Sequence, residues 1–146
     1  MEKENNDIVI DQDGRHFNYY VAGVLSSNNF VLLHNSSDSS AKYTLIGGKV
    51  KFGESAATAL KREFLEETGQ TITVGPLIKV MDHKVATSTE SWQQLLLIFA
   101  VKCPTLNNSK TPQGFTWVPK DSLSTVDLKP NIFTQKHANI YSSDFE

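Results

Sequence analysis

The sequence predicts one mixed α/β domain with a central β-sheet, and three observations support this fold class. Short apolar segments alternate with turn residues along the chain, as in a protein with several strands. Residues 55–69 have the periodicity and the end residues of an amphipathic helix. The most apolar segment, 92–102, is expected to be a buried strand at the centre of the sheet. The length of 146 residues fits a single domain covering residues 1–146.

Strands are expected where apolar or aromatic residues are bounded by turn signals. Residues 1–14 are polar and are expected to be a flexible N-terminal segment or a short edge strand. Residues 82–91 are expected to be a polar loop, and 131–137 a small helix followed by a loose end. The expected strands are 17–25 and 30–34, joined as a hairpin through 26–29, then 43–46, 71–74 and 77–81 with Gly75-Pro76 between them, 92–102 and 115–118.

The helix is predicted from its two ends and its apolar face. Ser55 is a suitable N-cap because its hydroxyl can accept a hydrogen bond from the first turn. Gly69 suits the position after the last turn, where the backbone is often left-handed. Between them Ala56, Leu60 and Phe64 recur at i, i+4 and i+8 and form an apolar stripe. We therefore expect the helix to pack on the sheet through this stripe.

Three acidic residues share one face of this helix, because Glu63, Glu66 and Glu67 stand at i, i+3 and i+4. Such a face is commonly solvated, although like charges at this spacing repel by a few tenths of a kcal/mol. A bound cation is the alternative, since Mg²⁺ prefers oxygen ligands and a small number of carboxylates. Glu54 adds an acid before the helix, and Arg62 can hold a carboxylate through a forked ion pair.

The residues before the helix are suited to a ligand that approaches the backbone. Gly47 and Gly48 have no side chains, so a ligand can come close to their carbonyl and amide groups. Lys49 follows at once and can meet a phosphate, and Tyr20 is one of several aromatic residues that could stack on a nucleobase. Gly48, Lys49 and Tyr20 are therefore the candidates for substrate binding.

The spacing of these residues forms a longer pattern. Gly48 is followed after five residues by Glu54, and after seven more by the run Arg62-Glu63-Phe64-Leu65-Glu66-Glu67-Thr68-Gly69. This pattern resembles the Nudix box, the signature of the MutT-like Nudix hydrolases. The resemblance extends from about residue 17 to residue 133, with FTWVP at 115–119 similar to a late strand of the family.

The chain departs from the family pattern at a few positions, none of which is a charged residue of the box. Gln70 stands where a bulky aliphatic residue is usual, and Ile46 where proline is frequent. Many relatives also place an acid on a later strand, where this chain has Gln93 and Gln94. An acid outside the box would therefore have to be Glu90, and its participation is left open.

The resemblance implies an α/β/α sandwich with a mixed β-sheet and a hydrolase that uses Mg²⁺ or Mn²⁺. The implied reaction is cleavage of a diphosphate linkage in a small nucleotide: a nucleoside triphosphate, ADP-ribose or a nucleotide sugar. Among the residues, it implies that Glu63, Glu66 and Glu67 bind the metal, together with the carbonyl oxygen of Gly47.

The remaining roles that the resemblance implies concern catalysis. Either Glu63 or Glu67 is expected to act as the general base, and the choice between them stays open. Glu54 and Arg62 are expected to support the metal ligands. His34 and His83 are expected to be an ordinary strand-end residue and an ordinary loop residue.

Composition narrows the class of partner. Apolar residues make up 39%, charged residues 21%, and the net charge is −2, which argues against a nucleic-acid or anionic-membrane surface. A single cysteine, Cys103, excludes an internal disulfide and favours a reducing compartment, so a cytoplasmic location is expected. No apolar run approaches the ~18 residues of a membrane-spanning helix. A homodimer is compatible with the sequence.

Two other functions compete with the hydrolase. A catalytically silent Nudix-fold module that binds nucleotides or regulates is expected to have lost box acids, and here all of them are present. An isomerase acting on an isoprenoid diphosphate finds little support in the single cysteine near a strand end.

Overall fold

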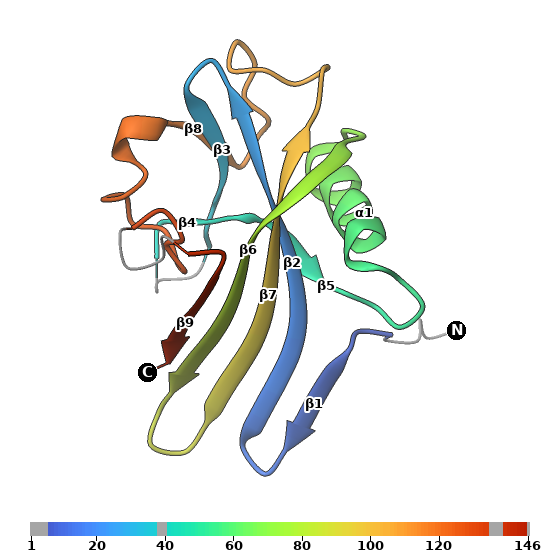
Figure 1. Cartoon of the computed structure of the whole chain (residues 1–146), viewed down its shortest axis with the longest axis vertical. Helices are drawn as coiled ribbons and strands as arrows, with labels where there is room; N and C mark the ends of the chain where they lie inside the picture. Colours follow the sequence, from blue (N-terminus) through green and yellow to red (C-terminus); the bar gives the residue numbers. More distant parts are fainter. Residues whose placement is uncertain (1–5, 38–40, 135–138, 146) are drawn as a thin grey trace.

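The computed structural model describes residues 6–37, 41–134 and 139–145, and within them nine strands form one mixed sheet. The expected α/β class is confirmed: a single sheet carries one α-helix in the described residues (Figure 1). The elements are β1 Val9–Gln12, β2 Arg15–Ser27, β3 Phe30–Asn35, β4 Tyr43–Thr44, β5 Ile46–Lys49, α1 Ala56–Thr68, β6 Thr73–Ala86, β7 Ser91–Lys102, β8 Phe115–Pro119, the 3₁₀ turn η1 Lys120–Ser122, and β9 Tyr141–Phe145.

The strand β2 organises the sheet. Along one edge it pairs in turn with β1, β5 and β3, all antiparallel, and along the other edge it runs parallel to β7 from Arg15 to Leu25. The sheet continues from β7 to β6 antiparallel and from β6 to β9 parallel. The segment 92–102, predicted to be central, therefore lies inside the sheet as most of β7.

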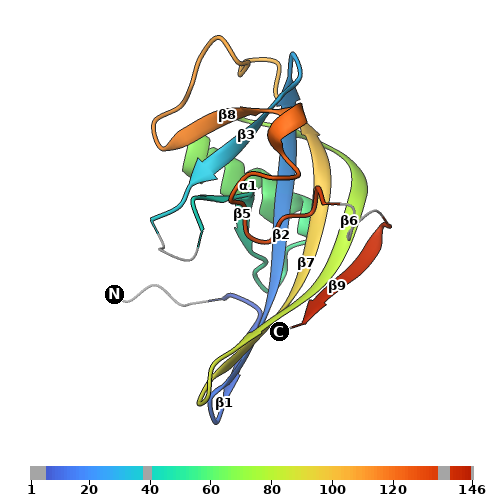
Figure 2. The same ribbon diagram turned by 90° about the vertical axis from the view of Figure 1, so that its left-hand side faces the viewer.

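The two faces of the sheet are covered by different parts of the chain. On one face α1 packs with Leu60 and Phe64, both fully buried, against Val21 and Leu25 of β2. On the other face the segment after β8 contributes Leu123, Leu128 and Ile132 to a second core. Figure 2 shows α1 and this segment on opposite sides of the strands. The second covering layer consists of η1 and turns in the described residues, where the sandwich prediction implied a helix.

The helix begins and ends where the sequence predicts. The hydroxyl of Ser55 accepts a hydrogen bond from the amide of Thr58 at 3.1 Å. Gly69 has φ 73° and its amide donates to the carbonyl of Leu65, so it ends α1 in the left-handed conformation. These caps fix the rotation and length of α1, and with them the direction of its acidic face.

No helix of the described ranges is long and apolar enough to cross a membrane.

The predicted loop over 82–91 is wrong, because β6 continues to Ala86 and only residues 87–90 connect it to β7. The polar residues Asp82 and His83 fit a strand since both neighbours, β7 and β9, hydrogen-bond to the backbone there. Gly75-Pro76 causes a shift of register in β6 but does not end the strand.

The two chain ends also differ from expectation. Of residues 1–14, the edge-strand alternative holds for β1, while residues 1–5 lie outside the described part. The predicted helix over 131–137 is wrong for its first part, which forms turns at 132–133, and its last part, 135–137, lies outside the described residues. The expected loose end forms β9 instead, because β6 offers an open edge with which it pairs.

Candidate active site

The predicted box lies where β5 faces α1. A Cβ at Gly48 would overlap the carboxylate of Glu63, and a Cβ at Gly47 would overlap the backbone of Val21. Both positions therefore require glycine: one because a carboxylate lies against the backbone, the other because β2 does. The helix thus holds Glu63 directly over a backbone stretch that has no side chains.

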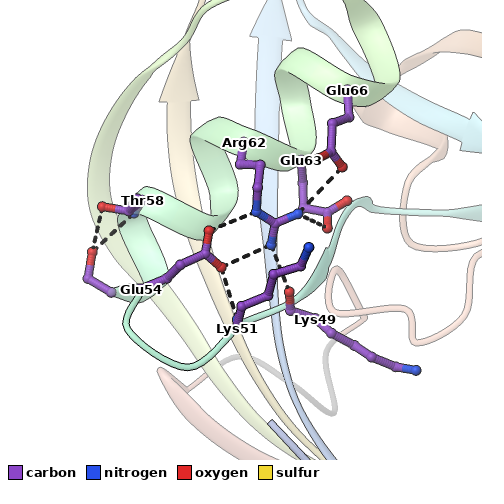
Figure 3. A network of polar contacts seen from close by, with 8 residues as sticks. Lys49, Lys51, Glu54, Thr58, Arg62, Glu63 and Glu66 are labelled. Carbon is purple, nitrogen blue, oxygen red and sulfur yellow. Dashed lines mark hydrogen bonds and ion pairs between the residues drawn. The ribbon is translucent and has the colours of Figure 1, made fainter. Parts of the chain in front are cut away.

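Arg62 forms the centre of the charged network shown in Figure 3. Its Nε and Nη2 donate to the two carboxylate oxygens of Glu54 at 2.7 and 3.0 Å, a forked pair. Nη2 also donates to the carbonyl of Lys49 at 3.1 Å, which ties the helix to β5. Nη1 contacts Glu63 at 2.8 Å and Glu66 at 3.4 Å. Of the two residues predicted to support the metal ligands, Arg62 contacts Glu63 and Glu66 directly, and Glu54 contacts Arg62.

Glu54 and Arg62 hold each other in the ionised form. The hydrogen bonds from Arg62, and then the amide of Lys51 at 2.9 Å, lower the pKa of Glu54 below its usual range. The same partner, Glu54, raises the pKa of Arg62 above its ordinary value. This pair therefore stays charged at every physiological pH and fixes the loop before α1.

Glu67 has a different environment. Burial, and then the charges of Glu63 and Glu66, raise the pKa of Glu67 to about 8, while the amide of Gly47 donates to its carboxylate and opposes the shift. Among the described residues no group donates a hydrogen bond to its buried Oε2. Its Oε1 lies 4.0 Å from Nδ1 of His34. Glu67 is thus a partly buried carboxylate, and its buried Oε2 has no hydrogen-bond partner in the described residues.

Glu63 lies between these two environments. Burial raises the pKa of Glu63, and the ion pair with Arg62 opposes that shift. Glu66 is the most exposed of the three, with a side chain 55% accessible. Across the described ranges, no three His, Cys, Asp or Glu side chains are gathered as closely as the ligands of a bound metal. Two of the three helix acids instead contact Arg62.

A cavity of about 290 Å³ opens on the sheet face opposite α1, close to these acids. Tyr20 lines the cavity and also senses the charges of the helix acids. Burial, and then the charges of Glu67 and Glu63, raise the pKa of Tyr20 to about 12. Polar side chains gather around the cavity, as is usual where a few groups orient a ligand. The polar residues that line it are Tyr20, Ser36, Thr44, His83, Gln94 and Lys129.

The structure also places residues that the sequence analysis did not select. His34, expected to be an ordinary strand-end residue, lies beside Glu67 and packs against Phe115 with ring centroids 4.9 Å apart. His83 and Gln94 line the cavity, although His83 was assigned to a loop. No local signal marks these residues, because β3, β6 and β7 bring them to the site from distant parts of the chain.

Glu90, the acid outside the box whose role was left open, lies elsewhere. Its Oε2 is 2.9 Å from Nε2 of His16. Figure 1 shows the β6–β7 turn beside the β1–β2 turn, at the end of the sheet away from α1. The structure therefore places Glu90 apart from Glu63 and Glu67.

Comparison with known proteins agrees with the fold and the signature. A model of the NUDIX domain matches residues 14–142. The nucleoside triphosphatase NudI of Enterobacter sp. (strain 638) is 34% identical over 109 residues, which are 65% of this chain and 76% of that protein.

Two solved structures are similar in fold. The mutator MutT protein from Bacillus halodurans superposes with a TM-score of 0.62 at 18% identity, over 86% of this chain and 88% of that one. A UDP-X diphosphatase superposes with a TM-score of 0.60 at 17% identity, over 87% of this chain and 66% of that one. The class of the protein is thus that of a hydrolase acting on pyrophosphate bonds. The chain belongs to the Nudix family.

Proposed function

We propose that this protein is a Mg²⁺- or Mn²⁺-dependent pyrophosphohydrolase that cleaves a diphosphate linkage in a small nucleotide. The observation that carries the proposal is the pair Glu63 and Glu67 at the bare backbone of Gly47 and Gly48, with Oε2 of Glu67 buried and not hydrogen-bonded in the described residues. A buried carboxylate oxygen without a donor is costly unless a cation or a proton occupies it.

The residues present fit a hard divalent cation. Every donor is an oxygen, as Mg²⁺ prefers: the carboxylates of Glu63, Glu66 and Glu67, and the carbonyl of Gly47. Arg62 contacts Glu63 and Glu66 in this arrangement, and we propose that these two acids exchange part of that contact for the ion. When bound, the ion neutralises charge on the diphosphate oxygens and lowers the pKa of a water molecule.

The chain itself contributes position and proton transfer. Glu54 holds Arg62 on both carboxylate oxygens, so the guanidinium stays in place when Glu63 or Glu66 turns towards the ion. One of Glu63 and Glu67 accepts the proton of the attacking water. We propose that Lys49 and the amide of Gly48, both in β5, bind phosphate oxygens of the substrate.

The cavity beside Tyr20 suits the nucleoside part of the substrate. At about 290 Å³ it is close to the ~300 Å³ lower end of small-molecule pockets. Its lining combines an aromatic ring with amide, hydroxyl and amine groups, which together can stack and hydrogen-bond a base. The relative NudI is a nucleoside triphosphatase by name, so nucleoside triphosphates are the first substrates to test, followed by ADP-ribose and nucleotide sugars.

Hydrolysis of a panel of these compounds, with product analysis to identify the bond cleaved, tests the proposal. Glu67→Gln keeps the shape of the side chain and removes its charge, so we expect turnover to fall by orders of magnitude while the circular dichroism spectrum is unchanged. Asp121→Asn, an exposed acid in η1, is the matched control and should retain full activity. Unchanged turnover in Glu67→Gln would contradict the assignment of the metal site.

A further inference from the structure

A second cavity, of about 190 Å³, opens on the same face of the sheet as the one beside Tyr20. On β2, His16, Phe17 and Asn18 line this smaller cavity, while Tyr20 and Ala22 line the larger one. Alternate residues of a strand point to one face, so the two cavities lie in line along β2. Between them Nε2 of Gln94 donates to Oδ1 of Asn18 at 2.9 Å.

Two stacked rings, His16 and Trp92, line the smaller cavity, and we call this pair the ring platform. The two rings stack with centroids 5.3 Å apart and planes 18° apart, and Trp92 is 41% exposed. Both nitrogens of His16 are held by carboxylates, Nδ1 by Asp11 at 2.6 Å and Nε2 by Glu90 at 2.9 Å. These two contacts restrict rotation of the imidazole, so one ring of the platform is oriented before any ligand binds.

One cross-strand pair next to the box lines both cavities. Tyr20 of β2 lies directly opposite Lys49 of β5, and residues opposite one another in antiparallel strands point to the same face. Tyr20 lines the larger cavity and Lys49 the smaller one. The carbonyl of Lys49 accepts a hydrogen bond from Arg62, and the charges of Glu63 and Glu67 act on Tyr20. Lys49 is thus at the part of the smaller cavity nearest the box, and His16 and Trp92 lie further along β2, towards the β1–β2 turn.

We propose that the ring platform binds a second planar ring that carries a phosphate, with the ring on Trp92 and the phosphate at Lys49. This proposal rests on the proposed function and assigns a ligand to a surface that the box does not include. At about 190 Å³ the cavity is smaller than the ~300 Å³ of a pocket for a whole drug-sized ligand, and so suits one ring. Such a ring has two sources: the second half of a two-ended substrate, or a separate mononucleotide.

Tryptophan fluorescence tests the platform without hydrolysis. The chain has two tryptophans, so Trp117→Phe leaves Trp92 as the only reporter. We expect a dinucleoside diphosphate, added without divalent metal, to quench Trp92. If AMP binds at least tenfold more weakly, the ring is the second half of the substrate; if AMP binds equally well, the ligand is a separate nucleotide. If neither compound alters the fluorescence of Trp92, the proposal is wrong.

Steady-state kinetics give an independent test of the first source. Stacking of a base on an aromatic residue is worth enough that its removal should raise KM about tenfold. Trp92→Ala should therefore raise KM for the dinucleoside diphosphate and leave KM for a nucleoside triphosphate unchanged, whereas Trp92→Phe should restore most of the loss. An equal rise of KM for both substrates would overturn the proposal. If no compound is hydrolysed, the proposed function fails, while the quenching experiment still decides whether the platform binds a ring.

Discussion

Two charged clusters in this protein each hold a basic side chain between acids, but they differ in how their charge depends on pH. At the box, Arg62 contacts Glu54, Glu63 and Glu66. At the far end of the sheet, His16 lies between Asp11 and Glu90. The guanidinium is charged at every accessible pH, whereas the imidazole titrates near neutrality. The first cluster is therefore a permanent scaffold for acids, and the second depends on pH.

The comparison also explains why Glu67 differs from its neighbours. Glu54, Glu63 and Glu66 share the charge of Arg62, while Glu67 lies towards His34. Burial lowers the pKa of His34, so near neutral pH this ring offers Glu67 no positive charge. In this arrangement a proton or a metal ion can neutralise the charge of Glu67, whose pKa is raised to about 8.

Of the substitutions that test this comparison, Gly48→Ala should have the largest effect on activity. The added Cβ overlaps the carboxylate of Glu63 and must displace it. A displacement of about 1 Å at a catalytic centre can cost roughly 100-fold in rate, so we expect kcat/KM to fall by about that factor. Affinity for Mn²⁺, measured by electron paramagnetic resonance, should fall in parallel. Normal Mn²⁺ affinity in this variant would show that Glu63 does not hold the ion.

Arg62→Met should have the next largest effect. It leaves Glu54, a partly buried acid, without its forked partner, and hydrogen bonds to charged groups are worth about 2 kcal/mol. We expect the free energy of unfolding, measured in urea, to fall by about this amount and by the same amount at every pH from about 6 to about 8. Lys61→Met, one residue away and exposed, is the control and should change little. A loss that varied strongly with pH would contradict the permanent charge of this cluster.

His16→Gln should have the smallest and the most pH-dependent effect. The hydrogen bonds of Asp11 and then Glu90 raise the pKa of His16 above its ordinary value of 6.5. A raised pKa in the folded chain gives full stabilisation below 6.5, where the unfolded chain is also protonated, and this stabilisation is lost as the pH rises through the folded-state pKa. We therefore expect the variant to be less stable than the wild type in weak acid and to approach it in weak base. A difference that grew with pH would contradict the contacts of His16.

The local parts of the fold and site could be predicted because their signals are contiguous. Ser55 and Gly69 cap α1 through neighbours within a few residues, and the acids of the box stand at fixed distances along one helix. Both depend on chemistry that a short window of sequence contains. A forked ion pair of Arg62 with a carboxylate was likewise expected, although the sequence analysis did not name Glu54 as the partner.

The missed parts depend on pairing between distant segments. Residues 82–86 are polar and resemble a loop, yet they form a strand because β7 and β9 both pair with them. His34 reaches Glu67 through β3, and its position follows from strand order, not from a motif. Metal binding, the substrate and the homodimer stay predictions, as does the cytoplasmic location.

The long strand β2 has a consequence for how this protein could change. Its positions 16, 18, 20 and 22 line the two cavities, while Val21 and Leu25 support α1 on the other face. Inserting or deleting one residue in this strand would exchange the two faces and send cavity side chains into the helix core. Substitution at every second position of β2 can therefore alter the cavities, whereas a change of length next to this strand is better tolerated in the flanking turns at Asp13-Gly14 and Asn28-Asn29.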